Sequence, residues 1–283
     1  MKKYDVIIIG TGAANIVLDA ALKQGLQCAV IEKGKFGGTC LTRGCIPTKV
    51  LATAADYIRE IQDLPKIGVE VEPAKMNWDI ISRRVWEKID EHKEVLRHYQ
   101  KYANLAIYQG SGFFTGEKTL QVKLHDGSLS EEMTAEKIII DVGARTNLPE
   151  ISGREATGYI CSETLFGDKY PKQPYKSLII VGGGPIGCEF SHIFAAAGTK
   201  VTVVQHNNRL LSKADEDISE QIRQNMEAFG IKTYLNANLL EAKKADDQKI
   251  LLFEDRETGE RIEVTGEEIM YATGIKPVSK EIK

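Results

Sequence analysis

The apolar positions of this chain fall in short runs separated by helical stretches. Residues 4–9, YDVIII, and residues 27–32, QCAVIE, are continuous apolar runs rich in β-branched side chains. Such runs are typical of parallel strands that are buried on both faces. A helical stretch over residues 13–24 lies between them. The pattern predicts a strand–helix–strand unit at the beginning of the chain.

The same order of elements recurs in the second half of the chain. Residues 178–181, LIIV, form another apolar run, and a helical stretch over residues 186–197 ends at Gly198. Residues 200–206, KVTVVQH, supply the next strand. The repeat indicates a second unit built on the same plan.

The remaining segments complete the two units. Residues 77–104 are charged and helical, and their apolar side chains recur at helical spacing. We expect these side chains in the core, without a cofactor role: Trp78, Ile81, Val85, Ile89 and Leu96. Residues 105–140 alternate like the strands of a β-meander, and strands return from residue 231 onward.

These elements predict an α/β fold with two tandem doubly wound (Rossmann-like) nucleotide-binding domains, each with a small β-meander. The expected bounds are residues 1–149 for the first domain and residues 150–274 for the second. Two prolines at residues 171 and 174 mark the connector that leads into the second strand–helix–strand unit.

A glycine turn follows the first strand, and an acidic residue ends the next one. Gly10 allows the tight turn, and Gly12 lets the backbone approach a pyrophosphate. The helix that follows offers N–H groups and the positive end of its dipole. Glu32 is placed to accept hydrogen bonds from a ribose 2′-OH. Asn15 stands where a third glycine or an alanine is usual, so the helix packs more loosely there or the asparagine faces a ligand.

The second turn, GGGPIG, carries three glycines in register with this fingerprint: Gly182, Gly184 and Gly187. Two such turns in one chain argue against plain α/β turns without a ligand. Gln205 takes the place of the acid that marks NAD, and no arginine stands there to bind the 2′-phosphate of NADP. The full set of glycines favours NAD over NADP, with His206 and Arg209 as candidate contacts to a 2′-phosphate.

Composition and charge narrow the function classes. The hydrophobic fraction is 42%, the charged fraction is 27%, and the net charge is −3. These values are normal for a globular protein and give no general attraction to nucleic acid or acidic membranes. No apolar run is long enough to span a bilayer, and the apolar start reaches glycine too soon for a signal peptide. We therefore expect a cytoplasmic protein that binds neither nucleic acid nor membrane.

Residues 37–49, GGTCLTRGCIPTK, hold Cys40 and Cys45 with four residues between them. A zinc site needs a second pair of ligands, whereas Cys161 and Cys188 stand alone, so no metal is expected. A pair of structural reduced thiols is a further alternative. Because the five cysteines form an odd set in an expected reducing compartment, a working redox disulfide is favoured over a disulfide framework.

The surroundings of the pair favour the redox alternative. Gly37 and Gly38 give close backbone access, and Thr39 offers a hydroxyl. Cys45 lies near the N-terminus of an expected helix, which stabilises a thiolate. Lys49, one turn later, either adds positive charge near that sulfur and a cofactor ring or is an ordinary surface lysine.

This segment resembles the active-site segment of the flavin-dependent pyridine nucleotide–disulfide oxidoreductases, and in pattern most closely that of dihydrolipoamide dehydrogenase and mycothione reductase. The run G-T-G-A-A-N at residues 10–15 is similar to the start of mycothione reductases. The resemblance covers essentially the whole chain. It implies FAD in the first domain and the nicotinamide nucleotide in the second. It also implies that residues 275–283 begin a segment that returns to the FAD domain.

The resemblance also implies roles for single residues. Cys45 is the sulfur that touches the flavin in a charge-transfer complex, and Cys40 is the interchange thiol that attacks the substrate disulfide. Lys49 lies near flavin N5 and pairs with Glu189. The further expected contacts with FAD are Ala13, Ala14, Lys33, Gly112, Phe113, Val142 and Gly143. Those with the nicotinamide nucleotide are Pro185, Ile186, Leu239 and Gly274.

Three features depart from the family pattern. DVGAR, residues 141–145, stands where A-T-G-[SA]-R is usual. LTRG replaces L-N-V-G, which places Arg43 between the cysteines, where a cation either lowers a thiol pKa or attracts an anionic substrate. The chain reaches Lys283 without the family's second FAD segment or the dimerisation domain that carries a His-Glu acid/base couple. A dimer, or completion by a missing C-terminal region, is therefore expected.

Three functions follow as hypotheses. The first is an oxidoreductase of the dihydrolipoamide dehydrogenase type, which passes electrons between NAD(P)H, FAD and a redox disulfide to a small-molecule or small-protein disulfide or dithiol substrate. The second is a flavin reductase or diaphorase. The third is a non-catalytic nucleotide-binding chain that another subunit completes.

Overall fold

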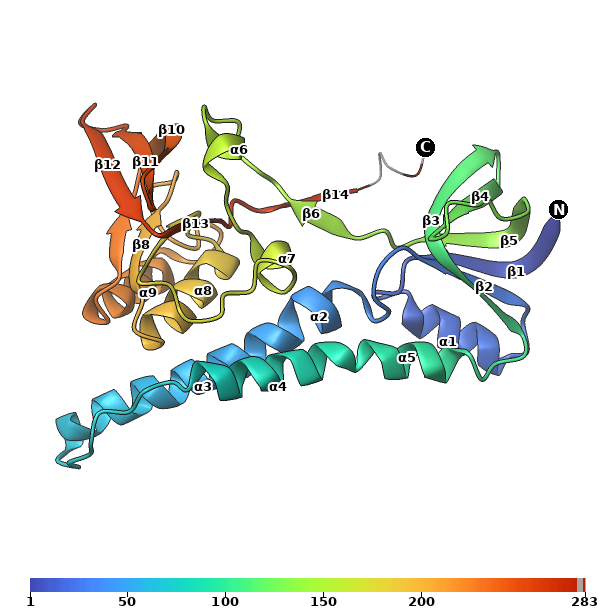
Figure 1. The fold of residues 1–283 in the computed structure, drawn as a ribbon, viewed down its shortest axis with the longest axis horizontal. Helices are drawn as coiled ribbons and strands as arrows, with labels where there is room; N and C mark the ends of the chain where they lie inside the picture. Colours follow the sequence, from blue (N-terminus) through green and yellow to red (C-terminus); the bar gives the residue numbers. More distant parts are fainter. Residues whose placement is uncertain (279–281, 283) are drawn as a thin grey trace. The chain divides into compact units, whose positions relative to one another are not determined.

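The structure, a computed structural model, describes residues 1–278 and 282, and these residues form two compact units (Figure 1). The first unit comprises Met1–Pro47, Trp86–Arg145 and the described residues from Lys276 onward. The second comprises Thr48–Val85 and Thr146–Ile275. The change of unit after Arg145 lies close to the expected bound at residue 149. Residues 48–85, however, pack with the second unit, so the units are not two consecutive blocks of sequence.

The first unit is built on five strands that close into a barrel. The strands are β1 (Lys2–Ile9), β2 (Cys28–Glu32), β3 (Leu105–Gly116), β4 (Thr119–Leu124) and β5 (Met133–Ile140). Parallel pairing joins β1 to both β2 and β5, and β2 to β3. Antiparallel pairing joins β4 to β3 and β5. The predicted parallel unit and the predicted meander are therefore one sheet, because β3 and β5 each belong to both.

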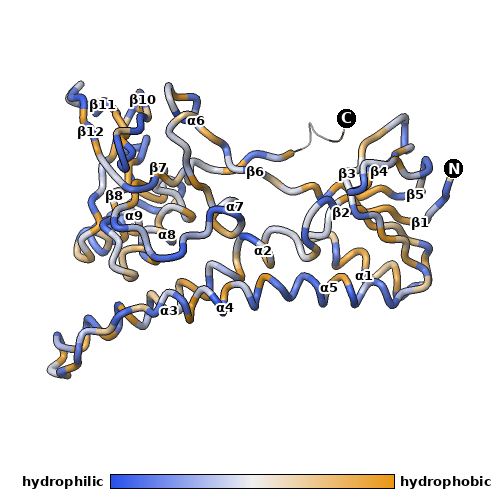
Figure 2. Tube along the Cα trace, in the orientation of Figure 1, coloured by the Kyte–Doolittle hydropathy of each residue, from blue (hydrophilic) through white to orange (hydrophobic). Residues whose placement is uncertain are grey.

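The apolar run in β1 is continuous because both faces of the strand are covered. Val6 and Ile8 pack in one cluster with Leu18 of helix α1 (Asn15–Lys23). Ile7 and Ile9 pack in a second cluster, on the other face. Alternate side chains of a strand point to opposite faces, so one run of apolar residues serves two cores. Figure 2 shows the hydrophobic residues along β1.

The second unit has the predicted parallel sheet and a separate antiparallel one. The parallel sheet has the order β13-β7-β8-β9, and its strands are β7 (Ser177–Val181), β8 (Lys200–Val204), β9 (Lys232–Tyr234) and β13 (Glu268–Tyr271). Strands β10 (Ala237–Ala245), β11 (Gln248–Asp255) and β12 (Arg261–Gly266) pair antiparallel, which confirms the meander expected here. Helices α8 (Pro185–Ala196) and α9 (Glu216–Ala228) follow β7 and β8.

The helical segment expected over residues 77–104 consists of two helices, α4 (Trp78–Asp90) and α5 (His92–Tyr99). They meet where the N–H of Glu91 bonds to the carbonyl of Lys88, three residues earlier, which tightens the turn. The core role of the apolar stripe is confirmed: Trp78, Ile81, Val85 and Ile89 are buried, and Leu96 packs against the first unit's core. Trp78 also donates from Nε1 to the carbonyl of Pro171 at 2.9 Å.

The other elements are short or join the two units along the chain. They are α2 (Gly38–Arg43), α3 (Cys45–Asp63), the 3₁₀-helix η1 (Leu64–Ile67), β6 (Ala144–Thr146), α6 (Arg154–Thr157), α7 (Ser162–Leu165) and β14 (Ile275–Pro277). Of these, α2 and α3 carry the cysteine segment.

Helix α1 offers a direct test of the first unit's core. Leu18 is fully buried, so Leu18→Ala leaves a cavity and should lower the free energy of unfolding by about 2–5 kcal/mol. Val17, the preceding residue, is 45% exposed, and Val17→Ala should stay within about 0.5 kcal/mol of the parent. Urea denaturation followed by circular dichroism measures both. Equal losses in the two variants would contradict this packing.

Candidate functional site

The first glycine turn lies against the backbone that follows β5. Gly10 has a φ of +106°, and a Cβ atom there would stand 2.0 Å from the carbonyl oxygen of Asp141. Gly38 has a φ of +64°, and its Cβ would stand 2.6 Å from the Cα of Gly12. No larger residue fits at either position, so the turn between β1 and α1 keeps a bare backbone, as a close approach to a ligand requires.

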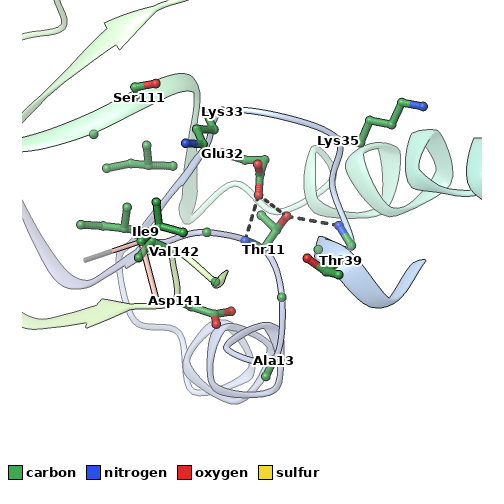
Figure 3. Close-up of a pocket in the computed structure, with 18 of the residues that line it drawn as sticks. Ile9, Thr11, Ala13, Glu32, Lys33, Lys35, Thr39, Ser111, Asp141 and Val142 are labelled. Atoms are coloured by element: carbon green, nitrogen blue, oxygen red, sulfur yellow. Dashed lines mark hydrogen bonds between the residues drawn. The ribbon is translucent and has the colours of Figure 1, made fainter. Parts of the chain in front are cut away.

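Glu32 holds this turn in shape (Figure 3). Its Oε2 accepts hydrogen bonds from the N–H of Thr11 at 3.0 Å and from Thr11 Oγ1 at 2.6 Å. Its Oε1 accepts the N–H of Gly34 at 2.7 Å, and Thr11 Oγ1 accepts the N–H of Gly37 at 3.2 Å. Thr11 therefore links the turn, the acid and the start of the cysteine segment. Sequence reasoning missed Thr11, whose hydroxyl gives no periodic or spacing pattern. The ribose contact of Glu32 stays a prediction.

A cavity of about 510 Å³ opens over this turn, within the size range of cofactor sites. Most of the predicted FAD contacts line it: Gly10, Gly12, Ala13, Glu32, Lys33, Gly37, Gly38, Thr39, Gly112, Val142 and Gly143. Ala14, Asn15 and Phe113 are not among the lining residues. The amide of Asn15 donates from Nδ2 to the carbonyl of Thr11 at 3.0 Å, and so it braces the turn.

Charged residues that the sequence did not single out for FAD also line the cavity. Lys35, Arg43 and Arg145 join Lys33 as basic residues of the lining. Asp141 adds a second acid beside Glu32. The basic residues favour an anionic ligand, whereas Asp141 opposes one close to the turn.

The two cysteines lie on successive helices. Cys40 belongs to α2 and lines the cavity, whereas Cys45 is the first residue of α3 and does not. The expectation that Cys45 lies near the N-terminus of a helix is confirmed. Gly44 separates the two helices, and a Cβ there would stand 2.9 Å from the carbonyl oxygen of Thr39. Both cysteine side chains are exposed, and the flavin-contacting role of Cys45 stays a prediction.

Lys49 and Glu189, the other expected catalytic residues, both belong to the second unit. Lys49 lies in the first turns of α3, and Glu189 lies on α8. Both side chains are exposed. In the part of the chain that the structure describes, no salt bridge joins them, and their pairing stays a prediction.

The second glycine turn repeats the geometry of the first. Gly182 has a φ of +108°, and a Cβ there would stand 2.5 Å from the carbonyl oxygen of Ala272. A Cβ on Gly187 would stand 1.9 Å from the carbonyl oxygen of Gly182. Gly184 is different, because no atom lies within 4 Å of its Cβ position. Pro185 and Ile186 follow as the first residues of α8.

Gln205 has the structural place of Glu32. Its Oε1 accepts the N–H of Gly183 at 2.9 Å, and its Nε2 donates to the carbonyl of Arg209 at 3.1 Å. The imidazole of His206 bonds to the carbonyl of Ala237 through Nδ1 and to the guanidinium of Arg256 through Nε2. Because a guanidinium only donates, Nε2 accepts and Nδ1 carries the proton.

Leu239 and Gly274, which were also predicted to contact the nicotinamide nucleotide, interact with other residues of the second unit. Leu239 packs against the core cluster between the two sheets. The carbonyl of Gly274 accepts the N–H of Asn147 at 2.8 Å.

Two cysteines outside the segment have a raised thiol pKa. Burial raises the pKa of the Cys188 thiol to about 11, with the charge of Glu189 adding to the shift. Burial also raises the pKa of Cys28, and the charge of Asp5 acts in the same direction. A high thiol pKa suppresses the reactive thiolate.

Two searches over the described residues bear on other classes of site. No group of three or more His, Cys, Asp or Glu side chains is arranged to hold a metal ion in that part of the chain. No helix found there combines the length and apolar character needed to cross a membrane.

The geometry defines a class of protein with two glycine-turn dinucleotide folds and a cysteine pair beside the first. Comparison with known families agrees: residues 4–283 match the family model described as pyridine nucleotide-disulphide oxidoreductase. The chain belongs to this family. The resemblance inferred from the cysteine segment is thereby confirmed.

The chain is also similar to named relatives. The chain is 30% identical to a dihydrolipoyl dehydrogenase of Bacillus subtilis over 96% of its own length and 58% of the relative's. It is 33% identical to the mycothione reductase of Mycobacterium tuberculosis over 78% of its length and 48% of the relative's. Among solved structures, the Cu(II) complex of the HOCl-induced flavoprotein disulfide reductase RclA from Escherichia coli superposes with a TM-score of 0.82 at 28% identity, over 100% of this chain and 59% of that one. The chain thus spans about half the length of the curated relatives.

The second turn offers a matched pair of substitutions. Gly187→Ala forces a methyl group into a backbone carbonyl and should cost at least about 2 kcal/mol of unfolding free energy. Gly184→Ala meets open space, its φ of −80° is one that any residue adopts, and it should cost less than about 1 kcal/mol. Thermal and urea unfolding of the two variants measure the difference. If Gly184→Ala proved the more damaging, the turn geometry described above would be wrong.

Thiol alkylation tests the contrast between the cysteines. In protein reduced with a phosphine, iodoacetamide at pH 8 should modify exposed Cys45 well before Cys188, of which only about one in a thousand is thiolate at that pH. The rate at Cys188 should rise steadily as the pH approaches 11. Peptide mass spectrometry at several time points gives both rates. Equal rates at pH 8 would refute the assignment.

Proposed function

We propose that this chain is the dinucleotide-binding portion of a flavin-dependent oxidoreductase. It passes electrons between NAD(P)H, FAD and a disulfide formed by Cys40 and Cys45. The observation that carries the proposal is that Cys40 lines the same cavity as Gly10 and Gly12. A sulfur that shares a cavity with a dinucleotide turn supports the proposal of a redox thiol beside whatever the nucleotide carries.

FAD fits most of the first unit's cavity. The glycine turn leaves room for a diphosphate, and four basic side chains line the cavity: Lys33, Lys35, Arg43 and Arg145. When bound, FAD supplies the two-electron chemistry that links a nicotinamide hydride to a disulfide. The residues of the chain orient it, hold its charge and present the sulfur atoms. Asp141, whose carboxylate accepts the N–H of Ala14 beside the turn, does not suit a diphosphate.

The cysteines carry the exchange with the substrate. In the dithiol form, the thiolate of Cys40 attacks one sulfur of the substrate disulfide, and a mixed disulfide forms as the first substrate thiolate leaves. The thiolate of Cys45 then attacks Cys40, which restores the Cys40–Cys45 bond and releases the second thiolate. Two electrons leave the protein for the substrate.

The second unit is proposed to bind the nicotinamide nucleotide, with NAD favoured over NADP. Arg209, the nearest candidate for a 2′-phosphate, pairs with Glu216 at 3.0 Å and donates to the carbonyl of Ser212. Arg256 donates to His206. Both guanidinium groups are therefore engaged within the protein, which weakens the case for a phosphate between them.

The substrate is proposed to be a small-molecule or small-protein disulfide or dithiol, and the compartment the cytoplasm. The relatives are longer than this chain, so a second copy or further residues would complete the site. A flavin reductase or diaphorase is the second candidate, because Cys45 lies outside the cavity lining and such an activity needs only the two dinucleotides.

Thiol counting after reduction tests the main proposal. The FAD-loaded chain, treated with NADH without oxygen and then denatured, should show Cys40 and Cys45 newly open to alkylation, whereas untreated protein should show neither. Cys161→Ser, which removes a buried cysteine of α7's N-terminus, should behave like the parent. Cys40→Ser and Cys45→Ser should lose the NADH-dependent gain of thiols.

Other outcomes decide between the candidates. Reduction of ferricyanide by NADH with no gain of thiols would favour the diaphorase. A purified protein that binds no FAD at all would overturn both functions and leave the non-catalytic alternative.

A further inference from the structure

The N-terminus of α1 is already in contact with a negative charge. Oδ2 of Asp141 accepts the backbone N–H of Ala14 at 3.0 Å, and Figure 3 shows the side chain beside the turn that carries Ala13. The same oxygen lies 2.9 Å from the Cβ position of Gly12. This is where a dinucleotide fold receives the pyrophosphate, because helix N–H groups and the positive dipole end point there.

The N–H of Ala14 is the donor that this carboxylate takes. The next three N–H groups, of Asn15, Ile16 and Val17, bond to carbonyls within the turn and helix. Asp141 thus uses a donor that a phosphate oxygen would otherwise receive. The side chain comes from outside the helix, and 127 residues separate it in sequence from Ala14.

The second unit shows what the same position looks like without the charge. The N–H of Asp141 bonds to the carbonyl of Ile9 at 2.8 Å, and the N–H of Ala272 bonds to the carbonyl of Val181 at 2.8 Å. Each of these residues also presents its carbonyl to the first glycine of its turn. Asp141 and Ala272 are therefore structural equivalents. The methyl group of Ala272 adds no charge, whereas Asp141 adds a carboxylate to an otherwise matching cradle.

We propose that Asp141 is a built-in anion that competes with the cofactor's diphosphate for the N-terminus of α1, and so sets the affinity of the first unit for FAD. This rests on the proposed function, in which that cavity takes FAD. Two negative groups a few ångströms apart repel strongly at a partly buried site. For FAD to bind, the carboxylate has to leave Ala14 or share it, and in the unliganded protein it stabilises the helix terminus.

The proposal predicts opposite effects on cofactor affinity and on the stability of the unliganded protein. Asp141→Ala, which copies the second unit, should bind FAD roughly ten- to a hundredfold more tightly than the parent, because the repulsion is gone. The same variant without FAD should melt at a lower temperature, because Ala14 loses its acceptor. Asp141→Asn keeps an acceptor and should bind FAD more tightly with a smaller loss of melting temperature.

Binding titrations of the apoprotein make the test. FAD and ADP, which carry a diphosphate, should both gain affinity in the Asp141 variants, and adenosine, which carries no phosphate, should not. Glu136→Gln is the matched control, since it removes an exposed charge from the middle of β5, the strand that precedes Asp141, and lies outside the cavity lining. It should leave the dissociation constants for FAD and ADP within about twofold of the parent.

The failures of the two proposals are distinguishable. If the parent binds FAD and Asp141→Ala binds it equally or more weakly, Asp141 is only a helix cap, and the competition is refuted. Equal gains for adenosine and ADP would refute it as well, since the effect would not depend on phosphate. If neither the parent nor any variant binds FAD, the proposed function itself fails, and the competition fails with it.

Discussion

The structure depends on the contact between each glycine turn and the carbonyl at the end of a neighbouring strand. Gly10 meets Asp141, and Gly182 meets Ala272, at distances that leave no room for a Cβ atom. This approach brings the strand end, the turn and the helix N-terminus to one point in each unit. In the first unit Glu32 and Thr11 then fix the shape of the turn, and the cavity forms above it.

An acid in the first unit and a neutral amide in the second make the same hydrogen bond to the glycine turn. Glu32 and Gln205 both accept the N–H of the second residue of the turn, although one is an acid and the other an amide. The residue at this strand end is thus first a brace for the turn. Its usefulness as a marker for NAD or NADP is correspondingly smaller, because the side chain is already occupied by the protein.

Much of this could be predicted from the sequence because it depends on local pattern. The continuous run in β1 predicted a strand covered on both faces, and the spacing of Trp78, Ile81 and Val85 predicted a buried stripe. The glycines and the cysteine segment located the cavity. The contacts of Asp141 could not be found in this way, because they join residues far apart in the chain. The sequence also did not predict that β3 and β5 each pair in both the parallel and the antiparallel part of the sheet. Strand pairing joins residues that are far apart in the chain, so local pattern does not reveal it.

Gly44 separates the two helices that carry Cys40 and Cys45. The backbone of residue 44 lies too close to Thr39 for a side chain, and residue 44 is where α2 ends, directly before α3 begins at Cys45. A disulfide between Cys40 and Cys45 would therefore join two separate helices and not two turns of one helix.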